Sequence, residues 1–213
     1  MPGKGQLLNA TVNVAVLGFL GFVAFGPNGY VRRVLTEQRA AREQAAVVRD
    51  LWPDMIEGRA GASPLIVVFT DYQCRYCRQM EDVLASLQEE GLLDVVYLHV
   101  PVAAIHPLAE DAARAAICAE AQGRFQAMHR HLFSTQSWQS DSAWTNEARA
   151  VGVHDVDAFS KCLTAASTTE RLARDRRMAE ALGVRGTPTF VSPKGMHRGV
   201  ATREQVLALA WKR

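Results

Sequence analysis

Short runs of apolar and β-branched residues alternate with longer segments of helical periodicity from residue 63 to the end of the chain. Four runs have the length and composition of strands, at 65–70, 95–100, 189–192 and 197–200. The last is expected at an edge of the sheet, after a turn at 193–195. Apolar residues that recur every three or four positions predict a helix over 74–90, and a closing helix is expected over 203–211. Strands and helices in this order indicate an α/β fold.

The longest helical stretch separates the second strand from the third. Pro107 suits the first turn of a helix, and from there to residue 182 the pattern is almost entirely helical. It is broken near Gly123, at 137–142 and near Gly152. We therefore expect a helical insertion over about 107–182 within one sheet-forming domain at 63–213.

The amino-terminal part of the chain has a different pattern. Residues 7–25 carry no charged side chain, and a helix of that length just spans the hydrocarbon core of a bilayer. A cleaved signal peptide is the alternative, but cleavage at Ala24-Phe25-Gly26 would leave Pro27 as the first mature residue. We therefore predict an uncleaved transmembrane helix, or an uncleaved signal, within residues 1–29.

A helical stalk or linker is expected between this anchor and the domain, over 30–62. Within 30–51 several apolar residues stand near heptad spacing: Val31, Val34, Ala41, Ala45 and Val48. Because this seam is mostly alanine and includes Gln38, it predicts a weak dimer at most. Glycine and proline residues in 53–64 mark the expected boundary.

Composition narrows the class of protein. Apolar residues make up 48% and charged residues 22%, as in an ordinary globular domain, and the part after the linker, roughly 150 residues, is long enough for one real core. The formal net charge is only +2, and no basic run is interleaved with aromatic residues. Nucleic acid is therefore not an expected partner.

Candidate chemistry begins at Cys74-Arg75-Tyr76-Cys77, directly after the first strand. The unpaired N–H groups and the dipole of a helix N-terminus stabilise a thiolate there, and Arg75 and Tyr76 are expected to tune the pair. Half of a zinc site is the alternative. A zinc ribbon needs a second close pair, however, and Cys118 and Cys162 stand far apart. We interpret residues 74–77 as a dithiol/disulfide redox centre.

A proline stands at the head of the third strand, in Gly186-Thr187-Pro188-Thr189-Phe190. By itself this is an ordinary turn signal. Together with the cysteine pair, three segments resemble the DsbA-like branch of the thioredoxin superfamily: Phe69-Thr70-Asp71-Tyr72-Gln73-Cys74-Arg75-Tyr76-Cys77, Ala115-Ala116-Ile117-Cys118-Ala119 and Gly183-Val184-Arg185-Gly186-Thr187-Pro188-Thr189-Phe190. The resemblance implies a thioredoxin fold with a helical insertion between the second strand and a cis-proline loop. It also implies that this loop lies against the redox pair.

The function that the resemblance implies is thiol-disulfide exchange, with no cofactor and no metal. Cys74 is expected to be the exposed nucleophile and Cys77 the resolving thiol, while Thr187 and Pro188 present backbone to an extended substrate. The expected partners are reduced or misoxidised exported proteins and a membrane redox partner, either a quinone-linked oxidase or a thiol reductase.

The direction of exchange is less determined. Arg75-Tyr76 departs from the Pro-His dipeptide of the best-known strongly oxidising members of the family. Disulfide formation is the expected activity. A disulfide isomerase or reductase of the same fold, and a non-catalytic peptide-binding or chaperone module, are the alternatives.

Cys118 and Cys162 lie in the helical insertion. Some DsbA-like proteins carry a second bridge there, and a structural disulfide between these residues suits an exported protein. Two unrelated buried thiols are the alternative.

Two signals conflict on the side of the membrane that the domain faces. Lys4 alone precedes the apolar segment and five arginines follow it before residue 50, so the positive-inside rule points the domain inward. Cysteine usage and the exported family point outward, and we expect an inner-membrane protein with its domain in the periplasm or another extracytoplasmic space.

The remaining polar residues suggest no metal site. His129 and His131 are two apart on a predicted helix and face different directions, so surface or polar-core roles are expected. Asp71, three residues before Cys74, is expected to be a turn residue.

Overall fold

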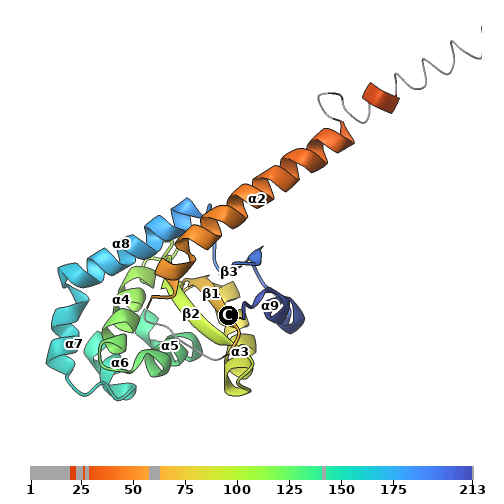
Figure 1. Ribbon diagram of the computed structural model, residues 1–213. Helices are drawn as coiled ribbons and strands as arrows, with labels where there is room; N and C mark the ends of the chain where they lie inside the picture. The colour runs from red at the N-terminus through yellow and green to blue at the C-terminus, as the bar shows by residue number, and fades with distance from the viewer. Residues whose placement is uncertain (1–19, 23–25, 27–28, 58–62, 141–142, 213) are drawn as a thin grey trace, which may run out of the picture. The chain divides into compact units, whose positions relative to one another are not determined.

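A computed structural model of the chain describes residues 20–22, 26, 29–57, 63–140 and 143–212 (Figure 1). The chain divides into two units, Met1–Ala46 and Val47–Arg213. Among the residues that the structure describes, no helix is both long enough and apolar enough to cross a bilayer. The expected anchor at 7–25 lies outside the described residues except for 20–22.

The second unit is built on a sheet of four strands in the order β2-β1-β3-β4. The strands are β1 (Leu65–Thr70), β2 (Asp94–His99), β3 (Thr189–Ser192) and β4 (Gly195–Arg198). β1 pairs with β2 in parallel and with β3 in antiparallel register, for example Val68 with Tyr97 and with Phe190. All six residues of β1 are buried, which is why it is a continuous apolar run in the sequence.

The edge strand β4 begins earlier than the expected run at 197–200. Ser192 pairs with Gly195, so that only Pro193 and Lys194 form the connection between β3 and β4. Gly199 then adopts a φ of 82°, in the region that favours glycine, and the strand ends before it. The residues of β4 are half-buried or exposed, as expected for an edge.

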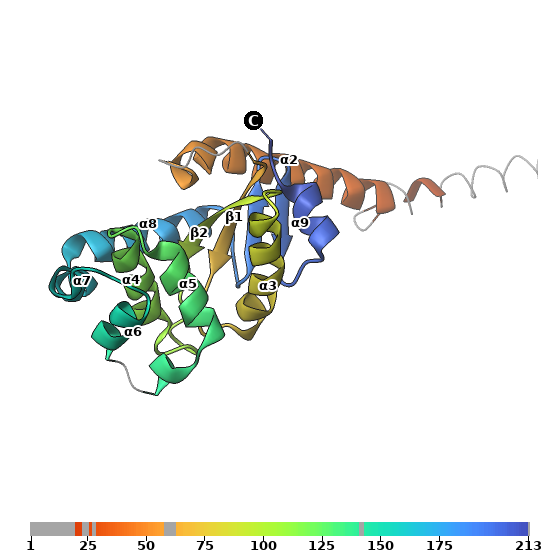
Figure 2. The ribbon, with the colours of Figure 1, turned by 90° about the horizontal axis from the view of Figure 1, so that it is seen from below.

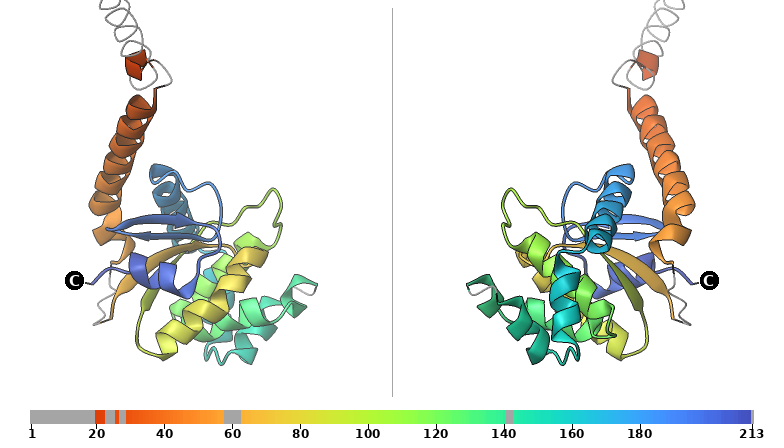
Figure 3. Two further views of the ribbon diagram at one scale, coloured as in Figure 1. Left: turned by 90° about the vertical axis from the view of Figure 1, so that its right-hand side faces the viewer. Right: turned by 90° about the vertical axis from the view of Figure 1, so that its left-hand side faces the viewer.

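Alternate residues of β1 point to opposite faces of the sheet, and helices cover both (Figure 3). Ile66 and Val68 pack with residues of α3 (Arg75–Glu89) and α9 (Arg203–Leu209). Val67 and Phe69 pack with residues of α8 (Ala166–Ala181) and with the last turns of α2 (Tyr30–Met55). The sheet is therefore the middle layer between two layers of helices.

The long helix α2 runs through most of the stalk or linker that the sequence predicted over 30–62. It continues through Pro53 to Met55. Val48, Trp52 and Met55 lie on one face of this helix and are buried with the apolar residues of β1 and α8. This packing extends the helix past the proline and places the start of the compact unit at Val47.

The helical insertion between β2 and β3 consists of α4 (Ala109–Glu120), α5 (Phe125–Ser134), the short 3₁₀ helix η1 (Ser137–Gln139), α6 (Trp144–Ala150), α7 (Val156–Leu163) and α8. Figure 2 shows α4 to α7 gathered at one end of the sheet. Gly123 and Gly152 have positive φ at the breaks between helices, where chain reversal favours glycine. Six alanines of α4 are fully or almost fully buried, which allows neighbouring helices to approach closely. The expected α/β fold with a helical insertion is confirmed for the described residues.

The insertion and the Cys74 region share one core. Cys74, Cys77 and Tyr72 belong to the same buried cluster as residues of α4, α5 and α7. The insertion therefore forms one wall of the environment of the cysteine pair.

Candidate active site

The cysteine pair is positioned by the chain reversal between β1 and α3. Cys74 is the N-cap residue of α3, with φ of −72° and ψ of 117°, and its backbone N–H donates to the carbonyl oxygen of Asp71 at 3.1 Å. No side chain caps this helix, so its first N–H groups are directed towards the Cys74 sulfur. Cys77 follows one turn later on the buried face of the same helix.

The two thiols have opposite electrostatic environments. A hydrogen bond with Cys77, together with Thr187 and the backbone N–H groups of Cys77 and Tyr76, lowers the pKa of Cys74 to about 5 against the opposing effect of burial. Burial, followed by the hydrogen bond with Cys74 and its charge, raises the pKa of Cys77 well above its usual value. One sulfur is therefore held as a thiolate and the other as a thiol, and both are free cysteines in this structure.

The exposure of Cys74 differs from the expectation. The residue was predicted to be exposed, but it is only 7% exposed, close to the 4% of Cys77. The proline loop lies against it, with the Cys74 Sγ at 3.3 Å from the carbonyl oxygen of Thr187. The two thiols therefore differ in reactivity because of their positions on the helix and their pKa values, and not because of their exposure.

The Thr187–Pro188 peptide bond is cis. The carbonyl oxygen of Pro188 accepts a hydrogen bond from the Gly199 N–H at 2.8 Å, and the Thr189 hydroxyl donates to the Gly186 carbonyl at 2.7 Å. These bonds hold the loop on both sides of the proline. The Thr187 carbonyl is thus the part of the loop that faces the cysteine pair.

Arg75 and Tyr76, the two residues between the cysteines, interact with each other. The Arg75 guanidinium donates to the Tyr76 hydroxyl and lies 4.5 Å from the centre of its ring. Tyr76 is 43% exposed and therefore contributes an aromatic surface beside the pair. This interaction keeps a positive charge at the rim of the site without burying it.

Asp71 is more than the turn residue that the sequence predicted. Its buried carboxylate accepts hydrogen bonds from the backbone N–H of Gln73 and of Val102, each at 2.8 Å, and lies 2.8 Å from His106 Nδ1. Asp71 thereby ties the turn before Cys74 to the loop after β2. In the sequence, Asp71 is only a carboxylate that follows an apolar strand. Its partners Val102 and His106 are too far along the chain to be inferred from that pattern.

A buried polar cluster lies behind the pair and was not predicted as a functional group. The Tyr72 hydroxyl is 2.9 Å from His129 Nδ1, and His129 Nε2 is 2.9 Å from a Glu81 carboxylate oxygen. The Tyr97 hydroxyl donates to the same oxygen at 3.5 Å. His129 fits the polar-core role expected for it, but its partners come from three other segments of the chain.

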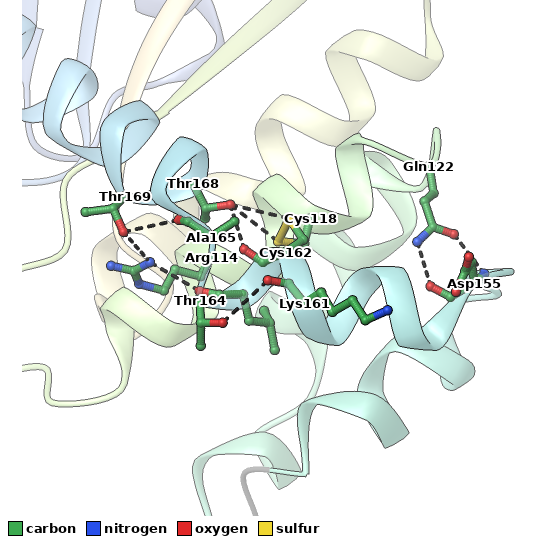
Figure 4. Close-up of a disulfide and its surroundings, with 11 residues drawn as sticks. Arg114, Cys118, Gln122, Asp155, Lys161, Cys162, Thr164, Ala165, Thr168 and Thr169 are labelled. Atoms are coloured by element: carbon green, nitrogen blue, oxygen red, sulfur yellow. Dashed lines mark hydrogen bonds between the residues drawn. A yellow bond between two sulfur atoms is a disulfide. The ribbon is translucent and has the colours of Figure 1, made fainter.

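The second cysteine pair lies within the insertion. Cys118 of α4 and Cys162 of α7 form a disulfide with an S–S distance of 2.02 Å and a Cα–Cα distance of 5.7 Å (Figure 4). The Thr168 hydroxyl donates to the Cys162 carbonyl at 2.7 Å and is within 3.8 Å of both sulfurs. Cys118 is completely buried, so this bridge joins two helices inside the insertion core.

Metal chemistry has no candidate site in the described ranges, where no group of three or more His, Cys, Asp and Glu side chains converges. A stabilised thiolate, a protonated neighbouring thiol and a backbone carbonyl beside them make the Cys74–Cys77 pair competent for thiol-disulfide exchange.

Known sequences match most of this chain. The family model described as thioredoxin matches residues 52–207. Among curated proteins, the Na(+)/H(+) antiporter NhaA 1 of Mycobacterium sp. strain KMS is 31% identical over 153 residues, covering 68% of this chain and 24% of the antiporter. NhaA 3 of Salinispora tropica is also 31% identical, over 147 residues. The chain spans about a quarter of the length of the curated relatives that it matches.

Solved structures give the same fold. A thioredoxin-like oxidoreductase from Silicibacter pomeroyi is 28% identical, with a TM-score of 0.61 over 68% of this chain and 83% of that one. The thiol-disulfide exchange protein alpha-DsbA2 from Wolbachia pipientis is 18% identical, with a TM-score of 0.68 over 78% and 93%. The catalytic domain of ScsC from Proteus mirabilis is 18% identical, with a TM-score of 0.64 over 78% and 95%.

Proposed function

The chain belongs to the thioredoxin family and has a DsbA-like fold, and from that premise we propose that it is a thiol-disulfide oxidoreductase that forms disulfide bonds in exported proteins. The observation that carries the proposal is the asymmetry of the pair. The pKa of Cys74 is lowered to about 5, while that of Cys77 is raised. A stabilised Cys74 thiolate favours the reduced dithiol and so makes the Cys74–Cys77 disulfide a good oxidant.

The proposed reaction proceeds through a mixed disulfide. A substrate thiolate attacks Cys74 Sγ, the bond from Cys74 to Cys77 breaks, and Cys77 leaves with the bonding electrons. A second substrate thiolate then attacks the substrate sulfur of the mixed disulfide and expels the Cys74 thiolate. The substrate is oxidised by two electrons and the enzyme is reduced to the dithiol.

Substrate binding is proposed at the proline loop. The Thr187 carbonyl lies beside the Cys74 sulfur, where it can pair with the backbone of an extended substrate segment. Tyr76, between the two cysteines in the chain, has an exposed ring that we propose as an apolar contact for the same segment.

We place the domain outside the cytoplasm, held to the membrane by residues 7–25. The Cys118–Cys162 disulfide supports this location because such bonds persist in oxidising compartments. The antiporter relatives support a membrane connection, since a segment related to this chain is part of proteins with that name. Re-oxidation of the dithiol then requires a membrane partner, and a quinone-linked oxidase is the proposed one.

The deciding experiment is the equilibrium between the Cys74–Cys77 couple and a glutathione redox buffer. A potential well above that of thioredoxin, about −270 mV, supports oxidation, whereas a value near it would make the protein a reductase. Oxidative refolding of a reduced protein substrate and reduction of insulin should be run in parallel, with Cys74→Ser as the control. A protein inactive in both assays would be a binding module and would refute the proposal.

A further inference from the structure

Exchange at the cysteine pair requires movement of a proton at Cys77. Cys77 is 4% exposed, and burial is the main reason why its pKa is raised. When the bond to Cys74 breaks, the Cys77 sulfur becomes a thiolate in an environment that does not stabilise it. A proton donor within the protein would assist this step, because a substrate bound at Cys74 covers the nearest surface.

The buried polar cluster behind Cys77 contains groups that can hold such a proton. Tyr72, His129 and Glu81 are connected by two hydrogen bonds of 2.9 Å each, from the phenol to one ring nitrogen and from the other nitrogen to the carboxylate. Tyr72 is 1% exposed, His129 is fully buried and Glu81 is 8% exposed. The mechanism above gives these three residues no task.

Two observations place the cluster next to Cys77. Glu81 follows Cys77 by four residues on the buried face of α3, and side chains at this spacing are neighbours on a helix. Tyr72 belongs to the same buried cluster as Cys77. Burial, then the charge of Glu81 and then that of Cys77, raises the pKa of Tyr72 well above its ordinary value.

The hydrogen bonds allow the cluster to take up or release one proton without rearranging. With a neutral His129 ring, Nε2 donates to Glu81 and Nδ1 accepts from the Tyr72 hydroxyl. With the other neutral tautomer, Nδ1 donates to the Tyr72 oxygen and Nε2 accepts from a protonated Glu81 carboxyl. Transfer of a proton from Glu81 to Nε2, of another from Nδ1 to Tyr72 and of a third from the Tyr72 hydroxyl to Cys77 converts this arrangement into the first one. The ring itself is enclosed by aromatic residues, with ring centres 3.9 Å from Tyr97, 5.3 Å from Phe125 and 5.1 Å from Phe133.

Glu81 also reaches solvent on a side other than the proline loop. It lines an open cleft of about 300 Å³ between α3, α5 and the start of β2. The polar residues that line this cleft are Glu81, Gln88, Glu89, Asp94, Gln126 and Arg130. Arg130 faces Glu89 across it at 3.6 Å, and the Tyr97 hydroxyl connects Glu81 to Gln88. The cleft therefore gives the buried cluster a contact with water that does not pass the substrate.

We propose that Tyr72, His129 and Glu81 form a proton path between Cys77 and solvent, which opens into the cleft beside α3 while substrate covers Cys74. In the oxidising direction Glu81 first takes a proton from water in the cleft. The substrate sulfur bonds to Cys74, the Cys74–Cys77 bond breaks, and Cys77 takes a proton from Tyr72 as His129 passes one to Tyr72 and Glu81 passes one to His129. In the reverse direction the Cys77 thiol gives its proton to the cluster, attacks Cys74 Sγ of the mixed disulfide and expels the substrate thiolate. Electrons and protons balance in both directions.

The other titratable groups around the path are Tyr97 and His99 of β2 and Arg130 of α5. The centre of the His99 ring is 5.6 Å from that of the Tyr72 ring. This inference rests on the proposed exchange at Cys74 and Cys77, but not on which direction dominates in the cell.

The test is a single-turnover measurement of the Cys77 step. Reduced full-length protein is converted to a mixed disulfide of Cys74 with thionitrobenzoate, and attack by Cys77 releases the coloured thiolate. The variants are Glu81→Gln and Tyr72→Phe, which keep side-chain shape and remove the carboxylate or the phenol hydroxyl. Asp82→Asn is the matched control, because Asp82 is the next residue of α3 and is exposed to solvent.

We expect both variants to release thionitrobenzoate about tenfold or more slowly near neutral pH, and added imidazole buffer to restore much of the rate. Asp82→Asn should match the native protein. Normal rates in both variants would overturn the proton path, and so would slow rates with no buffer effect, since a packing defect is not repaired by a small base. Failure of the native protein to release the label would instead refute the proposed exchange function. If Glu81→Gln fails to fold, as judged by its melting transition, Tyr72→Phe decides the question alone.

Discussion

At the scale of single residues, the chemistry of the site comes from where the two sulfurs stand on one helix. Cys74 caps α3, where N–H groups without helical partners face its sulfur, and Cys77 lies one turn further on, inside the core. Identical side chains therefore have pKa values displaced in opposite directions.

This asymmetry predicts selective alkylation of the reduced protein. At about pH 6, iodoacetamide should label Cys74 well before Cys77, because Cys74 is largely thiolate above a pKa of about 5 and Cys77 remains a thiol. Peptide mass spectrometry after short labelling times measures both sites. Faster labelling of Cys77 would exchange the roles of the two residues.

The same shift predicts how stability depends on pH. A thiol whose pKa is lowered from 9.0 to about 5 on folding stabilises the folded state above the higher value, and this contribution declines as the pH falls towards 5. The reduced protein should therefore lose stability relative to the oxidised protein across this window, since the disulfide form has no Cys74 thiolate.

Urea unfolding of the two forms at several pH values measures that difference. The stability of Cys74→Ser should not decline relative to that of the oxidised native protein over the same pH range, because the variant lacks the titrating thiol. A constant gap between the reduced and oxidised native protein would contradict the lowered pKa.

At the scale of elements, the end of α2 and the bridge between α4 and α7 hold the domain together outside the redox helix. The last turns of α2 fill one face of the sheet with Val48, Trp52 and Met55. The bridge closes a loop with a sequence separation of 44 within the insertion. Loss of either feature should lower the stability of the domain more than it lowers the thiol-disulfide exchange activity.

For α2, Trp52→Ala should lower the free energy of unfolding by about 3 kcal/mol, because it removes a large buried side chain from a packed face. Leu35→Ala is the control on the same helix, since Leu35 is 59% exposed. A chain beginning at Val47 should fold, whereas one beginning at Ser63 should be much less stable. Equal stability of the two truncated chains would show that α2 is only a linker.

For the bridge, joint replacement of Cys118 and Cys162 by Ala should lower stability by a few kcal/mol, up to about 4 in the chain-entropy model. Oxidative turnover at Cys74 and Cys77 should remain measurable in the folded variant. Thermal or urea unfolding and the refolding assay provide the two readouts. A folded variant without any turnover would mean that the second pair relays electrons.

At the scale of the whole molecule, the proposed function depends on holding the domain where exported chains emerge. The proposed anchor at 7–25 is in the unit that precedes Val47, and the domain that follows carries the complete site. Attachment to a membrane would keep the oxidant close to exported chains and to a membrane-bound oxidase.

Fractionation tests the anchor. The full chain should pellet with membranes and resist carbonate extraction, while a chain beginning at Tyr30 should remain in the supernatant with its dithiol activity intact. Recovery of a soluble native protein that begins near Pro27 would show a cleaved signal instead.

The sequence by itself determined the parts of this protein that depend on neighbours along the chain. The strands of the sheet, the redox helix and the insertion follow from apolar periodicity, which records which face of an element is buried. Cys74 and Cys77 were identifiable because a helix start after a buried strand is a local feature.

The tertiary structure decided which distant residues meet. Thr187 and Cys74 are 113 residues apart, and His129 is 48 residues from Glu81. Such pairs depend on how the insertion packs against α3, which no local period encodes. The same holds for Trp52, which lies just before the boundary that the sequence predicted from Pro53 onwards. Its burial depends on a face of the sheet that only the assembled domain provides.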